Sequence, residues 1–344
     1  MSRYYDMGLA ILLCGAFIAA TKGPSLKAIP SFGGATAWLN TQPLTAADLR
    51  GKVVVVEFWT YTCINWRRTL PYVRAWALRY KSKGLVVIGV STPEFSFEHD
   101  VSNVQRAAKE MGMDFPIAID NNYGIWQAFD NEYWPALYFI DAKGHIRHHQ
   151  FGEGDYQESE MVIQQLLIEA GAKDIPADFS QVNPSGAELA ADMNTLGSGE
   201  TYTGYGRTEN FSSPGGVVSD KPHVYTTSAH LQLNQWALEG DWTVDQEPAT
   251  LNQAGGRIIY RFHARDVNLI LGPAKPGTSL RFRVLIDGQP PGPAHGIDVD
   301  EHGNGRITEQ GMYQLIRQPG PIVNREFTIE FLDPGAQAFD FTFG

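Results

Sequence analysis

The sequence predicts an α/β domain followed by an all-β sandwich of the jelly-roll-like kind. Two observations carry this prediction. Strand-like and helix-like segments alternate over residues 28–171, whereas short strand-like runs separated by Gly and Pro turns fill residues 199–344. Residues 172–198, with scattered Pro, Ser, Gly and Asp, have the composition of a linker between the two. A chain of 344 residues is long enough for two domains of ordinary size.

The overall composition is that of a globular protein. Hydrophobic residues make up 43% of the chain and charged residues 19%, which excludes a disordered polypeptide. The formal net charge is −11, and no basic run interrupts the sequence. We therefore expect no nucleic-acid partner.

The α/β segment divides into elements by its hydrophobic pattern. Strands are expected at Val53–Trp59, Leu85–Ser91, Pro116–Asp120, Ala136–Asp141 and His145–Phe151. Helices are expected at Ile64–Lys83, Phe97–Met111 and Glu158–Ala170. Val53–Trp59 is apolar and β-branched, as strands buried on both faces are. Ser96 is the expected N-cap of the second helix, and Pro71 is expected to kink the first.

The second half of the chain has the texture of a β sandwich. The strand-like runs are Arg257–His263, Val267–Leu271, Leu280–Ile286, Phe327–Phe331 and Phe339–Phe343. Turn signals such as Gly272-Pro273 and Pro290-Pro291-Gly292 separate them. No internal repeat is visible.

The N-terminal twenty residues resemble a targeting segment. Arg3 precedes the apolar run Met7–Ala20, which is short for a membrane span and ends in small residues, as a secretory signal does. We expect residues 1–20 to be a signal peptide cleaved after Ala20, or an N-terminal anchor, and the protein to be exported to the periplasm or secreted. Cys14 lies in this run, so cleavage would leave Cys63 as the only cysteine and preclude an intramolecular disulfide.

Cys63 is the candidate nucleophile, because it stands where a buried strand meets a helix. Only the thiolate is nucleophilic, and a helix N-terminus lowers the pKa of a thiol placed on it. Arg67 follows by about one helical turn and could add a favourable charge. Glu57 lies in the preceding strand and could relay protons to the sulfur if buried, or face water at the strand end.

The motifs around Cys63 resemble those of the thioredoxin superfamily. The acidic residue six positions before the cysteine, Phe58-Trp59 and Pro71 match its pattern, so residues 28–171 resemble its TlpA-like, peroxiredoxin-related (redoxin) branch. Thr92–Tyr133 corresponds to the extra strand and helix of that branch. Trp134-Pro135 falls where the family has its cis-proline. The resemblance implies that Pro135 faces Cys63 and helps to bind the incoming disulfide.

A closer resemblance is to DipZ-type proteins. It rests on the run Trp59–Asn65 and on Pro71 in the first domain, and on Thr201–Tyr205 and Trp236–Trp242 in the second. The family's dithiol mechanism uses a second cysteine three positions after the first to resolve the mixed disulfide, and that position is Trp66 here. We expect Trp59, Thr60, Trp66 and Trp134 to frame the substrate cleft.

Three functions remain open for such a site. The first is a thiol oxidoreductase with a single active cysteine, whose mixed disulfide is resolved by an external thiol. The second is a one-cysteine peroxidase with antioxidant activity. Thr60 matches the peroxide-orienting threonine of peroxiredoxins, although Val56 replaces the proline expected before it. The third is a redox-inactive binding scaffold. The partner is an external thiol or a disulfide-bearing protein, and no cofactor is expected.

Two weaker signals lie in the second half. Asp298, Asp300 and Glu309 partly fit a calcium loop, although a hairpin turn at His302–Gly305 explains the segment equally well. The resemblance to carbohydrate-binding sandwiches suggests a glycan platform, although aromatic residues in a sandwich more often form its core. The aromatic candidates for this platform are Trp236, Trp242, Tyr202 and Tyr205.

Overall fold

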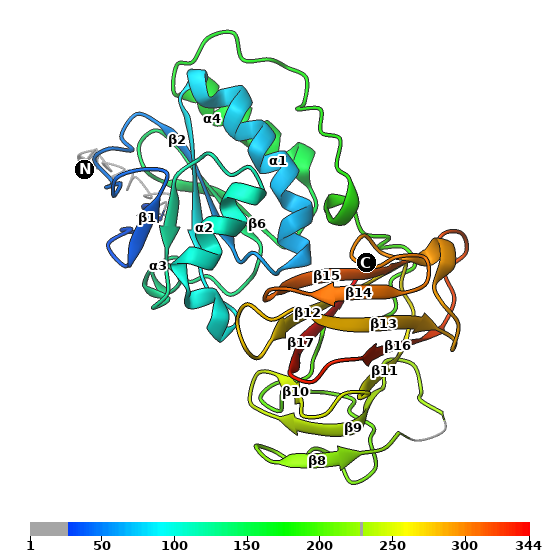
Figure 1. The fold of residues 1–344 in the computed structure, drawn as a ribbon. Coiled ribbons are helices and arrows are strands. Elements are labelled where there is room, and N and C mark those ends of the chain that lie inside the picture. Colours follow the sequence, from blue (N-terminus) through cyan, green and yellow to red (C-terminus); the bar gives the residue numbers. More distant parts are fainter. Residues whose placement is uncertain (1–26, 228–229) are drawn as a thin grey trace, which may run out of the picture.

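The computed structural model describes residues 27–227 and 230–344 (Figure 1). The targeting segment expected at residues 1–20 lies outside the described residues. Among the helices in these two ranges, none has the length and apolar character needed to cross a membrane. The chain forms an α/β domain and, after it, a region built from strands, which we call the β module (residues 199–344).

The α/β domain is built on a six-stranded sheet in the order β1-β4-β3-β2-β5-β6. Strands β2, β3 and β4 are parallel, and β1, β5 and β6 run antiparallel to their neighbours. The strands are β1 Ala37–Leu39, β2 Val53–Trp59, β3 Leu85–Ser91, β4 Ile117–Ile119, β5 Ala136–Ile140 and β6 Ile146–Phe151. Because every residue of the central strand β2 is buried, its run of valines has the expected setting.

Helices cover both faces of this sheet. They are α1 Ile64–Tyr80, α2 Val101–Glu110, α3 Gly124–Ala128 and α4 Tyr156–Glu169. Buried side chains of α1, α2 and α4 share one core cluster with Val53 and Val55 of β2, while α3 packs on the opposite face with Val54 and Val56. The strand alternation therefore places Glu57 on the same face as α1.

The second helix departs from the prediction at its start. Ser96–His99 forms a 3₁₀ turn, and α2 begins only after Asp100. The side chain of Asp100 accepts a hydrogen bond from the backbone N–H of Ser102, so Asp100 and not Ser96 is the N-cap. The first helix contains Pro71, as predicted, and ends in the 3₁₀ turn Lys81–Lys83.

The β module is one eleven-stranded sheet that folds over on itself. The main path runs β14-β13-β16-β11-β9-β10-β17-β12-β15, with β7 beside β17 and β8 beside β9. The strands are β7 Thr201–Tyr202, β8 Pro222–Tyr225, β9 Trp236–Val244, β10 Ala249–Leu251, β11 Arg257–Phe262, β12 Asp266–Pro273, β13 Leu280–Ile286, β14 Asn304–Ile307, β15 Gly311–Arg317, β16 Arg325–Phe331 and β17 Ala336–Phe343.

The two halves of this sheet enclose an apolar core. Tyr260 of β11 contacts Phe341 and Phe343 of β17 with ring centroids 5.2 and 5.1 Å apart. Phe327 of β16 contacts Phe341 in the same way. The predicted all-β sandwich is therefore confirmed, in the form of a strongly curved sheet.

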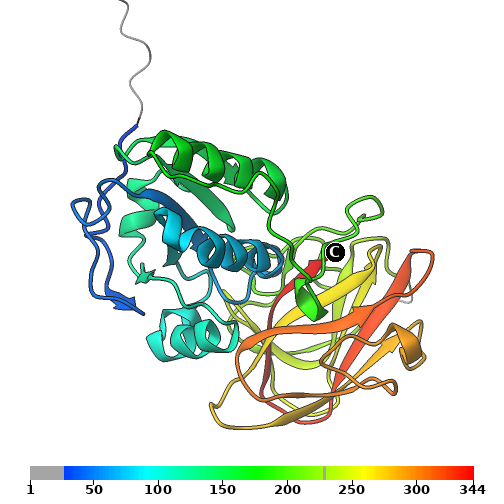
Figure 2. The same cartoon turned by 90° about the horizontal axis from the view of Figure 1, so that it is seen from above.

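The β module packs beside the end of α1 that carries Cys63 (Figures 1 and 2). Gly344 lies so close to the guanidinium of Arg68 that a side chain at position 344 would clash with Nη2. Phe339 of β17 joins the core cluster of the α/β domain. The connecting segment also touches α1, where Arg74 pairs with Glu188 at 2.7 Å.

Candidate active site at Cys63

Cys63 is the N-cap of α1. Its backbone is extended, with φ −68° and ψ 115°, and its carbonyl oxygen accepts the first helical hydrogen bond from the N–H of Arg67 at 3.0 Å. Trp59 ends β2 four residues earlier, so a tight turn aims the thiol at the edge where the parallel strands end. The strand-to-helix junction predicted from the sequence is therefore confirmed.

Pro135 brings the start of β5 beside the thiol. The Trp134–Pro135 peptide is cis, as the family resemblance implied. Phe58 pairs with Ala136 across the antiparallel β2–β5 ladder, which sets the two loops side by side. Sγ of Cys63 lies 3.9 Å from the carbonyl oxygen of Trp134. Cys63, Trp134 and Pro135 thus form one site.

Trp66 fills the space behind Cys63. Its side chain is fully buried and stacks on Trp59, with ring centroids 4.5 Å apart and an interplanar angle of 27°. Both tryptophans were expected to frame the cleft, but they belong to the core behind the thiol. Trp66 therefore seals this side of the site where a dithiol enzyme would hold its second sulfur.

Glu57 is completely buried on the same side. Within the described part of the chain, neither carboxyl oxygen has a hydrogen-bond partner. Burial raises the pKa of Glu57 to about 8, with the nearby Trp66 side chain acting in the opposite direction. Glu57 is accordingly protonated at neutral pH, and the alternative of a water-facing carboxylate is wrong.

The electrostatic setting of Cys63 differs from the prediction. Burial raises the pKa of the Cys63 thiol, and the backbone N–H groups of Trp66 and Asn65 lower it only in part. The carboxylates of Glu94 and Glu200 raise it further. Although part of its surface is accessible, the thiol lies deep enough between the two domains for desolvation to outweigh the helix N-terminus.

Arg67 is the arginine that acts on Cys63. Its Nε donates to the carbonyl oxygen of Tyr61 at 3.0 Å, and its charge interacts with Cys63 and with Asp298 of the β module. Burial lowers the pKa of Arg67. Arg68, by contrast, pairs with Glu153 at 3.0 Å, away from the thiol. The candidate role of Arg67 as the favourable charge near the sulfur fits this placement.

Thr60 is close to a second buried carboxyl, Glu98. It is buried beside Glu98, and hydrogen bonding from the hydroxyls of Thr60 and Thr62 partly offsets the burial that raises the pKa of Glu98. Sequence reasoning missed Glu98, because the residue lies 35 positions beyond Cys63 and no motif marks it. Glu94 and Glu200 escaped notice for the same reason. Only the folded chain brings all three to the site.

The calcium interpretation of the β module does not fit the geometry. Asp298 accepts the backbone N–H of Gln314 at 2.7 Å, and Asp300 accepts from residues of its own turn. Glu309 pairs with Arg106 at 2.9 Å. The three carboxylates do not converge, and no metal-binding group of acidic, His or Cys side chains exists among residues 27–227 and 230–344. The hairpin alternative explains the segment.

The tryptophans proposed for a glycan platform form core instead. Trp236 and Trp242 are fully buried, and the indole N–H of each donates to a backbone carbonyl. Tyr202 lies in the contact between the two domains, where it meets Glu94. Only Tyr205 of the four is exposed. The alternative that the aromatic residues form core is therefore correct for Trp236 and Trp242.

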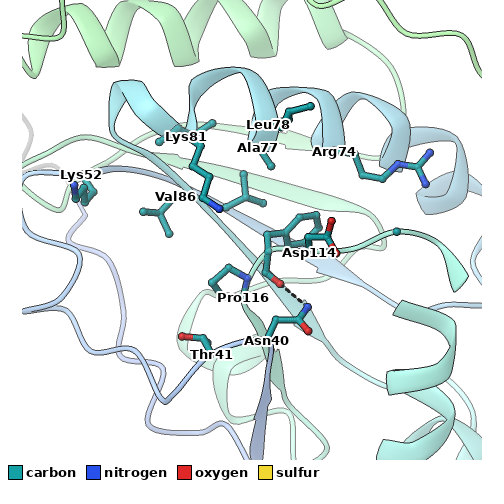
Figure 3. Close-up of a pocket in the computed structure, with 14 residues that line it drawn as sticks. Asn40, Thr41, Lys52, Arg74, Ala77, Leu78, Lys81, Val86, Asp114 and Pro116 are labelled. Carbon is teal, nitrogen blue, oxygen red and sulfur yellow. Dashed lines mark hydrogen bonds between the residues drawn. The ribbon is translucent and has the colours of Figure 1, made fainter. Parts of the chain in front are cut away.

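A separate cavity of about 600 Å³ lies on the flank of the α/β domain (Figure 3). Its wall includes Arg74 and Leu78 of α1, Lys81 of the 3₁₀ turn that follows, and Asn40 directly after β1. The side-chain amide of Asn40 donates to the carbonyl oxygens of Met113 and Phe115. None of the residues at Cys63 lines it. This cavity is distinct from the candidate active site.

Comparisons with known proteins agree with this geometry. Residues 26–149 match the AhpC/TSA family, and residues 198–344 match the thioredoxin-like C-terminal domain. The chain joins an AhpC/TSA-family domain to a thioredoxin-like C-terminal domain. It is similar to protein DipZ of Mycobacterium bovis, with 41% identity over 266 residues, which cover 76% of this chain and 36% of DipZ. The chain thus corresponds to only part of that longer relative.

The α/β domain is also similar to shorter proteins. Thiol-disulfide oxidoreductase YkuV of Bacillus subtilis is 28% identical over 141 residues, covering 41% of this chain and 95% of YkuV. A solved thioredoxin-like protein in the oxidized form is 30% identical, with a TM-score of 0.39, and covers 42% of this chain and 97% of that protein. The α/β domain is therefore similar to YkuV over nearly the whole length of that protein.

Proposed function

We propose that the protein is a thiol-disulfide oxidoreductase that works with one cysteine, Cys63, and an external resolving thiol. The observation that carries the proposal is the placement of Cys63 at the start of α1 against the carbonyl of Trp134, with buried Trp66 where a second thiol would stand.

The chemistry takes two exchange steps. The Cys63 thiolate attacks one sulfur of a disulfide, forms a mixed disulfide and releases the other sulfur as a thiolate. A thiolate from a second molecule then attacks the partner's sulfur in the mixed disulfide, which forms a new disulfide and returns Cys63 as a thiolate. One disulfide is broken and one is formed in these two steps, and Cys63 ends unchanged. Full two-electron reduction of the original disulfide requires a second incoming thiolate, which attacks the new disulfide and releases the remaining sulfur as a thiolate.

Neighbouring side chains have distinct roles in this proposal. Arg67 stabilises the thiolate by its charge, and Pro135 holds the loop that receives the disulfide. Glu57 is a completely buried, protonated carboxyl near the Trp66 side chain. Trp134 lines the accessible side of the thiol.

The proposal is tested by trapping the mixed disulfide. The reduced protein is incubated with glutathione disulfide, and intact mass spectrometry reads the adduct, which a second thiol should remove. Cys63→Ser should abolish the adduct, whereas the matched variant Cys14→Ser should keep it. An adduct that survives Cys63→Ser, or none in any variant, would contradict an exchange function and favour a redox-inactive binding scaffold.

A peroxidase is the alternative that uses the same thiol. The burial of Thr60 near Glu98 disfavours it, because a peroxide-orienting hydroxyl has to be reached by the peroxide. Dimedone labelling after one equivalent of hydrogen peroxide separates the two functions. Rapid labelling of Cys63 supports the peroxidase, and its absence together with a glutathione adduct supports exchange.

The setting of this chemistry is also part of the proposal. We infer that residues 28–171 and 199–344 act as the two domains, joined by 172–198, and that they work after export to the periplasm or the outside of the cell. An external thiol or disulfide protein is the partner. Cell fractionation with an antibody against the β module tests the location, and a protein confined to the cytoplasm would refute it.

A further inference from the structure

Glu98 ties the Cys63 loop to a neighbouring loop. Its carboxylate is 1% exposed, and Oε1 accepts the hydroxyl hydrogen of Thr62 at 2.6 Å. Oε2 accepts the backbone N–H groups of Glu94 and Phe95 at 2.7 and 3.1 Å. Since Thr62 directly precedes Cys63, one buried side chain holds the cysteine loop and the loop after β3 in a fixed relation.

The loop held by Glu98 is the one that contacts the β module. The Glu94 carboxylate accepts the hydroxyl hydrogen of Tyr202 at 2.6 Å and a guanidinium hydrogen of Arg207 at 3.0 Å. The Arg207 guanidinium lies over the Tyr202 ring, 3.5 Å from its centroid. Two residues later, the backbone N–H of Ser96 donates to Glu247 of the module at 3.0 Å.

Aromatic packing completes this contact. Phe95 and Phe97 pack edge-on against Phe339 of β17, with ring centroids 5.5 and 4.9 Å apart. Phe97 also contacts Tyr61, two residues before Cys63, at 6.2 Å. The docking of the module therefore rests on the same short segment that Glu98 connects to the cysteine loop.

We propose that Glu98 is a positioning residue that makes the reactivity of Cys63 depend on the docking of the β module. The inference rests on the proposed function only in taking Cys63 as the reactive group. While the module is docked, the hydrogen bonds of Glu94, Glu98 and Thr62 keep these residues in place, and the thiol stays buried. Release of the module frees the cysteine loop and exposes the thiol to its partner.

The charged groups around the thiol support the same dependence on docking. Glu94 comes from the loop after β3, Glu200 from the segment before β7 and Arg67 from α1. Burial and the two carboxylates raise the pKa of Cys63, and the charge of Arg67 interacts with Cys63. Release of the module removes burial and moves Glu200 away, so the thiolate fraction near neutral pH rises on opening.

The test is a double-mutant cycle on the full chain, read by the rate at which iodoacetamide alkylates Cys63 across a pH series. Tyr202→Phe removes the hydroxyl that holds Glu94 and leaves the net charge unchanged. We expect it to accelerate alkylation near neutral pH by about fivefold and to lower the pH midpoint. In a Thr62→Val background the same change should alter the rate by less than about twofold, because the connection through Glu98 is broken.

Matched controls separate this connection from general loosening. Tyr225→Phe removes a tyrosine hydroxyl inside the module, where it accepts the N–H of Val218, and should leave the rate unchanged. Thr69→Val removes a buried hydroxyl that donates to the carbonyl oxygen of Asn65 in α1 and lies next to the Tyr156 hydroxyl. It should therefore preserve the effect of Tyr202→Phe. Thr62→Ser keeps the donor to Glu98 and should behave as the wild type.

The outcomes are distinct. An unchanged rate in Tyr202→Phe would refute the dependence on docking. An effect of Tyr202→Phe that persists fully in Thr62→Val would refute the role of Glu98. If Thr62→Val does not fold, Thr62→Ala replaces it in the same cycle. Alkylation needs no disulfide partner, so a failure of the exchange function would appear in the glutathione experiment and not here.

Discussion

The two carboxylates buried nearest the cysteine loop, Glu57 and Glu98, have opposite surroundings. Glu57 lies behind Cys63 against Trp66 and has no hydrogen-bond partner in the described chain. Glu98 lies on the side of the β module and accepts hydrogen bonds from Thr62, Glu94 and Phe95. Equal burial therefore gives two different groups. Glu57 is a neutral carboxyl enclosed in the core, whereas Glu98 holds two loops together through its hydrogen bonds.

The largest expected effect comes from replacing Trp66, the buried tryptophan on the Glu57 side of the site. Trp66→Cys places a thiol three positions after Cys63, next to a carboxyl whose pKa is raised to about 8. We expect a disulfide between the two cysteines and a gain of insulin reduction in the presence of dithiothreitol. The reduced form should lose about 3–5 kcal/mol of stability, because a fully buried indole is removed.

The control for this variant is Trp76→Cys. Trp76 is also fully buried on α1, but it faces Glu160 and not Cys63. It should lose stability without forming a disulfide. Equal behaviour of the two variants in a free-thiol assay would contradict the placement of Trp66 as the substitute for a resolving cysteine.

The next effect is the pH dependence that Glu57 confers on stability. Its folded pKa of about 8 exceeds the ordinary 4.5. The folded chain therefore holds a proton that the unfolded chain releases, and the stability is complete below about pH 4.5 and is lost as the pH rises to about 8. The free energy of unfolding should fall by up to about 5 kcal/mol over this pH range, and Glu57→Gln should abolish this fall. Urea unfolding of both proteins at several pH values checks it, and parallel curves would contradict it.

A third prediction applies one substitution to both carboxylates. Glu98→Met should destabilise the protein by about 3 kcal/mol, because two buried backbone N–H groups and the Thr62 hydroxyl lose their acceptor. Glu57→Met removes no hydrogen bond and should leave stability near pH 8 equal or higher. Urea unfolding measures both, and a larger loss for Glu57→Met would reverse the comparison.

The smallest expected effect on stability comes from Gln314 of β15. Its side chain is fully buried, and neither amide atom has a hydrogen-bond partner among the described residues. Gln314→Met should change stability by about +1 kcal/mol. Gln318 is also buried, but its amide donates to the carbonyl oxygen of Ala264 at 2.7 Å, so Gln318→Met should be destabilising by about 1 kcal/mol. A loss of stability in Gln314→Met would show that its amide is satisfied in solution.

Much of the fold could be predicted from the sequence. Val53–Trp59, Leu85–Ser91 and Leu280–Ile286 have the predicted limits, because each is a strand whose apolar pattern ends at a turn. The start of α2 was missed, because Ser96 and Asp100 are both acceptable N-caps and only the 3₁₀ turn between them decides. The short elements α3 and β1 carry too few residues for a periodic signal.

The sequence by itself determined that the thiol stands at the end of a buried strand and the start of a helix, and that no cysteine stands at position 66. The resemblance to the thioredoxin superfamily implied the cis Trp134–Pro135 peptide. These features depend on residues within a few positions of each other or on a motif. The tertiary structure alone decided the state of the thiol. Desolvation and charge depend on every atom within several ångströms, and here those atoms come from Glu94, Glu98 and Glu200, which fold back from distant parts of the chain.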